Sequence, residues 1–277
     1  MRLLTMQLLP TGLSLAVALG ATLATPLTAL ALENKPLLNP VPSLITPAQT
    51  GPQGTSLDMQ LQEGFDALEA EQYSKALKLF DQVIEANATR AIAWMGRGYA
   101  LSGLDRYGEA VAAFQQSVEL DGTLYYGWMG LGLAHEAQAN FEAAVAAYDA
   151  AIAVDSQTVW AWYHRGFALV NLDRYEAALT SFDRAVQIDP KLASAWYYRG
   201  WVLGALERYE QAVASFDQSL ALAPNDAWAW YHRGLALAYA GETENAIASV
   251  QRALQIDPNL TDAQVLLDQL QQVANSR

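Results

Sequence analysis

The chain has 277 residues, of which 52% are hydrophobic and 16% are charged, and its formal net charge is −13. An acidic chain with only four lysines repels nucleic acid and anionic lipid, so no nucleic-acid partner is predicted. The sequence contains no cysteine, which excludes disulfides, thiolate metal ligands and a cysteine nucleophile. Aromatic residues make up 10% of the chain, a composition that excludes disorder over its whole length.

Residues 1–31 have the pattern of an export signal. Arg2 precedes an apolar run at 13–24, and an Ala-x-Ala sequence follows at 29–31, which is typical of a cleaved signal peptide. The alternative is an uncleaved membrane anchor, because the uncharged stretch 3–32 is long enough to span a bilayer. Both readings place the remaining chain outside the cytoplasm, and membrane contact is expected only if the segment stays uncleaved.

Residues 32–56 follow as a predicted linker. They contain five prolines and show no apolar period, so we expect a semi-extended, flexible segment. Such a linker would separate the following domain from a membrane or from a neighbouring protein.

The sequence from 57 to 260 repeats with a period of 34 residues. With Leu57 as position 1, six repeats align without insertion or deletion, at 57–90, 91–124, 125–158, 159–192, 193–226 and 227–260. Position 8 is Gly and position 20 is Ala in all six repeats, and position 4 is Trp in the last five. Apolar residues recur at helical spacing on both sides of a short polar break. Each repeat is therefore predicted to form two helices.

The glycine at position 8 needs a structural cause, because glycine within a helix costs about 1 kcal/mol relative to alanine. We expect the two helices of a repeat to approach closely there, with Gly at position 8 facing Ala at position 20. The aromatic residue at position 24 would fill the space around them.

This pattern resembles the tetratricopeptide repeat family, through Trp at 4, Gly at 8, Tyr or Phe at 17, Ala at 20, an aromatic at 24 and Pro at 32. The resemblance covers 57–260 and implies an all-α fold, a right-handed α-solenoid of six helix-turn-helix repeats. Residues 261–277 are predicted to form a C-terminal capping helix. Its expected apolar side consists of Val265, Leu266, Leu270 and Val273. The resemblance also implies an exported bacterial scaffold, in the periplasm or, for a photosynthetic source, in the thylakoid lumen.

Opposite charges placed 16 residues apart predict ion pairs between successive repeats. The pairs are Asp81/Arg97, Asp149/Arg165, Asp183/Arg199 and Asp217/Arg233. Each joins position 25 of one repeat to position 7 of the next, and at the two other junctions Gln and Leu replace both partners. Because Asp and Arg are replaced together, we expect structural ion pairs that fix how successive repeats stack. A charged site for a ligand is the alternative.

Positions 2, 5, 9 and 12 share one face of the first helix, and the resemblance implies that this face lines a concave groove. The predicted partner-binding residues are Met95, Tyr99, Met129, Leu133, Trp160, Tyr163, Phe167, Tyr197, Trp201, Trp228 and Tyr231. Tyr and Trp provide large, rigid contact areas, and Met adapts to different partners. The alternative is packing between neighbouring first helices. Family members that clamp a chaperone's terminal carboxylate use Lys and Asn at positions 5 and 9, which are absent here.

No catalytic residue, cofactor or metal site is predicted. His135, His164 and His232 lie in different repeats without metal-ligand spacing, and no phosphate-binding loop or catalytic triad is recognisable. We therefore predict a non-enzymatic scaffold that binds a segment of another exported protein and assists assembly of an envelope or membrane complex. The alternatives are a self-associating, homo-oligomeric envelope protein and, less favoured, glycan binding, for which the face carries few hydroxyl-binding side chains.

Overall fold

The computed structural model describes residues 56–275, so the predicted signal segment and nearly all of the predicted linker lie outside the described residues. The described chain forms 13 α-helices and no strand, which confirms the all-α solenoid of helix-turn-helix repeats. It divides into two compact units, an N-terminal unit at 56–172 and a C-terminal unit at 173–275. We call the first helix of each repeat the A helix and the second the B helix.

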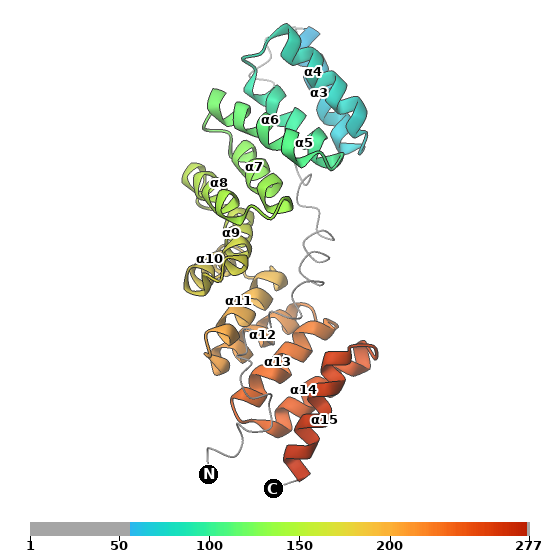
Figure 1. Ribbon diagram of the computed structural model, residues 1–277, viewed down its shortest axis with the longest axis vertical. Helices are drawn as coiled ribbons and strands as arrows, with labels where there is room; N and C mark the ends of the chain where they lie inside the picture. Colours follow the sequence, from blue (N-terminus) through green and yellow to red (C-terminus); the bar gives the residue numbers. More distant parts are fainter. Residues whose placement is uncertain (1–55, 276–277) are drawn as a thin grey trace. The chain divides into compact units, whose positions relative to one another are not determined.

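The N-terminal unit contains the first three repeats and the A helix of the fourth. Its A helices are α3 (Ser56–Glu69), α5 (Ala91–Gly103), α7 (Tyr125–Ala137) and α9 (Val159–Asn171), and its B helices are α4 (Tyr73–Ala86), α6 (Tyr107–Leu120) and α8 (Phe141–Val154). Within this unit, consecutive helices from α3 to α9 pack against one another, and α3 contacts α5, α5 contacts α7, and α7 contacts α9 (Figure 1).

The C-terminal unit begins with the B helix of the fourth repeat and ends with the capping helix. Its helices are α10 (Tyr175–Ile188), α11 (Ala193–Ala205), α12 (Tyr209–Leu222), α13 (Ala227–Tyr239), α14 (Thr243–Ile256) and α15 (Thr261–Asn275). Packing follows the same rule as in the N-terminal unit, since consecutive helices contact one another and α13 contacts both α11 and α15.

The glycine at position 8 lies against the side chain at position 24, which is an aromatic ring for Gly64 and Gly98 and Val250 for Gly234. A Cβ added to Gly234 would also lie 3.2 Å from the backbone carbonyl of Ala246, the position-20 neighbour expected from the sequence. A Cβ added to Gly98 would lie 2.7 Å from the ring of Phe114, and one added to Gly64 would lie 2.8 Å from the ring of Phe80. Neither distance is compatible with a real side chain. Both rings are fully buried, so in these two repeats glycine makes room for a buried aromatic ring.

Position 15, which follows the A helix, has a positive φ in all six repeats. The residues there, with their φ angles, are Glu71 (55°), Asp105 (58°), Ala139 (56°), Asp173 (55°), Glu207 (59°) and Gly241 (86°). This left-handed conformation stops the helix and lets the next amide bond back to the carbonyl of position 11, as from Arg106 to Leu101 at 2.9 Å. Five of the six positions adopt it without glycine.

The tryptophan at position 4 ties each repeat to the loop before it. Its indole Nε1–H donates to the backbone carbonyl at position 32 of the preceding repeat, at 2.8–3.0 Å. The donors are Trp94, Trp128, Trp162, Trp196 and Trp230. Because the acceptor is a backbone atom, position 32 accommodates Ala, Gly and Ser as well as the family's Pro.

The capping helix α15 buries Leu266 and Leu270, while Val273 is half-buried. Val265 is 52% exposed, so its predicted place on the buried side was wrong. It occupies position 5, whose side chain in other repeats contacts the next A helix, as Tyr197 contacts His232 at 3.1 Å. No described helix follows α15, so this side chain has nothing to pack against.

Candidate functional site

All four ion pairs expected between repeats are present, with the Arg Nε donating to the Asp Oδ1 at 2.6–2.8 Å. The pairs are Arg97 with Asp81, Arg165 with Asp149, Arg199 with Asp183, and Arg233 with Asp217. The aspartate side chains are between 41% and 53% exposed, whereas the arginines are half-buried. Exposed pairs contribute little stability, so their geometry supports a role in setting repeat register.

The arginines make contacts beyond the pairs that the charge pattern predicted. Each guanidinium lies over the position-4 tryptophan ring of its own repeat, at 5.7–6.0 Å from the ring centre: Arg97 over Trp94, Arg165 over Trp162, Arg199 over Trp196 and Arg233 over Trp230. Arg199 and Arg233 also donate from Nη1 to a serine of the next B helix, Arg199 to Ser215 at 2.5 Å and Arg233 to Ser249 at 2.6 Å. Each of these arginines therefore joins its ion pair and also packs on the ring that anchors its repeat.

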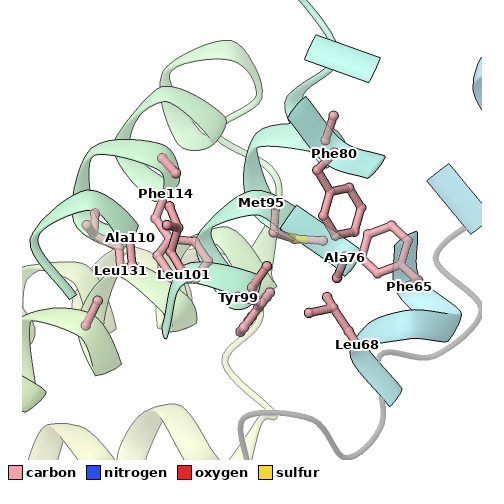
Figure 2. Packing of buried hydrophobic residues seen from close by; sticks show 14 of the residues in the cluster. Phe65, Leu68, Ala76, Phe80, Met95, Tyr99, Leu101, Ala110, Phe114 and Leu131 are labelled. Atoms are coloured by element: carbon pink, nitrogen blue, oxygen red, sulfur yellow. The ribbon is translucent and has the colours of Figure 1, made fainter. Parts of the chain in front are cut away.

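We call the surface made by positions 2, 5, 9 and 12 of the A helices the A-helix face. Eight of the eleven residues predicted to bind a partner there are buried: Met95, Tyr99, Met129, Tyr163, Phe167, Tyr197, Trp201 and Tyr231. Figure 2 shows Met95 and Tyr99 inside a cluster with Phe80 and Phe114. These eight residues are packed inside the protein, as in the alternative in which neighbouring first helices cover this face.

The polar tips of two buried tyrosines also bond within the protein. The Tyr99 hydroxyl donates to the backbone carbonyl of Tyr126 at 2.7 Å, and the Tyr197 hydroxyl lies 3.1 Å from Nδ1 of His232. Both bonds join position 5 or 9 of one A helix to the next A helix. An aromatic stripe that looks like a contact surface in the sequence thus serves largely to join neighbouring repeats.

The remaining three predicted residues, Leu133, Trp160 and Trp228, are half-buried. Their role in binding stays a prediction, and the two tryptophans are set in matching surroundings. The Trp160 ring meets Tyr163 edge-on at 5.7 Å between ring centres. Trp228 meets Tyr231 in the same way at 5.9 Å. Each tryptophan ring also contacts the histidine that follows the tyrosine, His164 at 6.3 Å and His232 at 5.9 Å.

We call these two groups the tryptophan clusters: Trp160, Tyr163 and His164 in the N-terminal unit, and Trp228, Tyr231 and His232 in the C-terminal unit. They share one local sequence, because the heptapeptide Trp-Ala-Trp-Tyr-His-Arg-Gly occurs at both 160–166 and 228–234. From this identical heptapeptide, the likeness of the two clusters could have been predicted from the sequence.

The two histidines are held by the ring at position 24 of the preceding repeat. His164 stacks on Tyr148 at 5.7 Å, and His232 stacks on Phe216 at 6.1 Å. Burial lowers the pKa of His232 to about 4, although its bond to the Trp228 carbonyl acts in the opposite direction. That carbonyl lies 3.0 Å from Nδ1 and only accepts hydrogen bonds. The neutral ring therefore carries its proton on Nδ1.

Neither a metal site nor a membrane span emerges from the described part of the chain. Between residues 56 and 275, no group of three or more His, Asp or Glu side chains is arranged to hold a metal ion. None of the helices described there is both long and apolar enough to cross a membrane.

Comparison with family models matches the tetratricopeptide repeat at residues 61–123, 129–193 and 197–260. The chain belongs to the tetratricopeptide repeat family. Proteins of this family typically act as non-enzymatic scaffolds that bind other proteins or peptides. A comparison with curated proteins gave no match.

Several solved structures share the fold. One is YrrB, described as a TPR protein with an unusual peptide-binding site, which is 24% identical with a TM-score of 0.62 over 66% of this chain and 95% of that chain. MamA is 20% identical with a TM-score of 0.59, covering 61% of this chain and 92% of its own. A tetratricopeptide repeat protein from Parabacteroides merdae is 14% identical with a TM-score of 0.57, covering 78% and 99%. At these identities the likeness shows the fold alone.

Proposed function

We propose that this chain is an exported, non-enzymatic scaffold that binds a segment of another protein at its two tryptophan clusters. The observation that carries the proposal is their repetition, since one heptapeptide builds the same arrangement around a half-buried tryptophan in both units. Partly exposed tryptophans are prominent among the residues that dominate binding energy at protein interfaces.

The surroundings of each tryptophan favour binding because they hold the ring in place before a partner arrives. Trp160 and Trp228 each contact a buried tyrosine and a buried histidine. A side chain that is already ordered loses little conformational entropy on binding. The solved structure of YrrB, whose peptide-binding site is described as unusual, supports a peptide segment as the kind of partner.

The export of the chain and a role in assembling an envelope or membrane complex belong to the same proposal. They rest on the signal-like pattern at 1–31 and the linker composition at 32–56. Periplasm and thylakoid lumen are the two compartments that this pattern allows.

Self-association through the ends of the solenoid is less well supported. At the first described helix, positions 6 and 10 carry the exposed Gln62 and Asp66, hydrogen-bonded to each other at 2.8 Å. The next two repeats have buried glycine and alanine at those positions. At the other end, α15 exposes Gln264, Asp268 and Gln271. Polar end surfaces of this kind oppose end-to-end stacking.

The proposal is tested by capturing partners from the envelope fraction of the source organism with residues 32–277 as bait. A second bait carries Trp160→Ala and Trp228→Ala. We expect a protein that the first bait retains and the second loses. Changing the eight buried residues would damage packing, so these two tryptophans are the informative positions.

The control bait carries Leu120→Ala and Leu222→Ala, which remove aliphatic side chains that are 39% and 42% exposed at the ends of two B helices. All baits are checked for equal helix content by circular dichroism. A partner lost equally from the control and from the tryptophan variant, or retained by all three baits, would contradict binding at the tryptophan clusters.

A further inference from the structure

Glu136 is the only acidic residue in the five helices α5, α7, α9, α11 and α13. It occupies position 12 of the third repeat, on the A-helix face. The other residues at this position are Leu68, Ser102, Val170, Gly204 and Ala238, none of which carries a charge. A single carboxylate on an otherwise uncharged stretch of helix surface calls for an explanation.

The carboxylate lies against two side chains of neighbouring helices. The Tyr148 hydroxyl donates to Oε2 of Glu136 at 2.8 Å, and Nδ1 of His164 lies 3.4 Å from the same oxygen. Tyr148 is the only tyrosine at position 24, where four other repeats have Phe and the last has Val. Burial, reinforced by Glu136, raises the pKa of Tyr148 well above its usual value, so the phenol keeps its proton and remains a donor.

These contacts hold the carboxylate without pairing it with a lysine or an arginine. The Glu136 side chain is 12% exposed, and among residues 56–275 no lysine or arginine lies within ion-pair distance of it. A largely buried carboxylate costs free energy unless a positive charge or several hydrogen bonds compensate it. Both observed contacts use Oε2, and neither involves Oε1.

We infer that Glu136 is the recognition site for a cationic side chain of the bound partner, with arginine preferred over lysine. The inference rests on the proposed function, because Glu136 and Trp160 both contact the ring of His164. A guanidinium group pairs with a carboxylate through a planar fork and stacks on an aromatic face. The net charge of −13 also favours a basic segment as partner.

The test uses acetyl-arginine amide as a probe on residues 32–277, with acetyl-citrulline amide as its uncharged counterpart. Binding is followed by the NMR signal of the Trp160 indole N–H, assigned with Trp160→Phe. We expect a saturable shift with the arginine probe and binding at least about tenfold weaker with the citrulline probe, as expected when an ion pair is lost.

Two variants separate recognition from a structural role. Glu136→Gln keeps the shape of the side chain, and we expect it to weaken arginine binding about tenfold while citrulline binding is unchanged. Tyr148→Phe installs the residue that most other repeats carry at position 24, and we expect arginine binding to persist. Equal shifts from both probes, no shift from either, or arginine binding unaffected by Glu136→Gln would overturn the inference.

The inference and the proposed function fail in distinguishable ways. If Glu136→Gln retains a captured partner that the tryptophan variant loses, with no arginine preference, the charge recognition is wrong and the scaffold role stands. If the arginine probe binds through Glu136 but the tryptophan variant still captures every partner, binding at the tryptophan clusters is wrong and the cation site stands.

Discussion

The His232 side chain is 3% exposed, and its ring stacks on those of Phe216 and Trp228. Burial lowers its pKa from 6.5 to about 4. Between these pH values the unfolded chain binds a proton here that the folded chain does not. The free energy of unfolding therefore falls as the pH is lowered through this range, and is regained as the pH rises. The full effect is about 3 kcal/mol.

The variant His232→Tyr tests this titration, because position 6 of the preceding repeat already carries Tyr198, stacked on Phe182 at 5.8 Å. We expect urea denaturation to show a smaller loss of stability between pH 7 and pH 4.5 in the variant than in the wild type, by on the order of 2 kcal/mol. An identical pH dependence in both proteins would show that His232 takes up its proton equally in the folded and unfolded chain.

Ala139 adopts a left-handed conformation, with φ of 56°, at the position where the last repeat has Gly241. This conformation costs an alanine about 1–2 kcal/mol, while glycine loses more conformational freedom on folding. We expect Ala139→Gly to raise the free energy of unfolding by about 0.5–1 kcal/mol. The control, Ala146→Gly in the exposed middle of α8, should lower it by about 1 kcal/mol. Destabilisation by both changes would contradict the strain at Ala139.

At the scale of the helices, the junction between α10 and α11 shows how the repeats are joined. Arg199 donates to Asp183 at 2.7 Å and to Ser215 at 2.5 Å, and it lies over Trp196. Arg199→Leu alone leaves Asp183 without this partner. Adding Asp183→Gln recreates the Gln and Leu combination of two other junctions. In thermal and urea unfolding, we expect the double variant to lie within about 1 kcal/mol of the wild type and the single variant to be less stable.

A difference between these two variants would measure the coupling of the pair, as a double-mutant cycle requires. Equal loss of stability in the single and double variants would show that the arginine acts through Ser215 and Trp196 rather than through Asp183.

The helices and the ion pairs could be predicted because both follow from spacing. A period of 34 residues without insertion assigns every residue a place in a helix, and the joint loss of Asp and Arg at position pairs 25 and 7 identifies the contact. The A-helix face was harder, since spacing shows that Tyr197 and Trp201 share a face but not that a neighbouring helix covers it. The contact of Glu136 in α7 with Tyr148 in α8 could not be predicted, because the 34-residue period does not identify which side chains of the two helices face each other.

At the scale of the whole molecule, the chain combines a negative net charge with polar surfaces at both described ends and one tryptophan cluster in each unit. The negative net charge opposes association between copies of the chain, and most of the exposed side chains at both described ends are polar. These features favour a scaffold whose repeats join to one another internally and whose partner contacts are confined to a few exposed positions.

The most direct test of this account is photo-crosslinking in the living source organism, with a photoreactive phenylalanine at position 160 or 228 and, as controls, at position 120 or 222. The account predicts that positions 160 and 228 crosslink to a protein other than this chain, while both control positions give no such product. Crosslinks from 160 and 228 only to other copies of this chain, or to the same proteins as the controls, would contradict it.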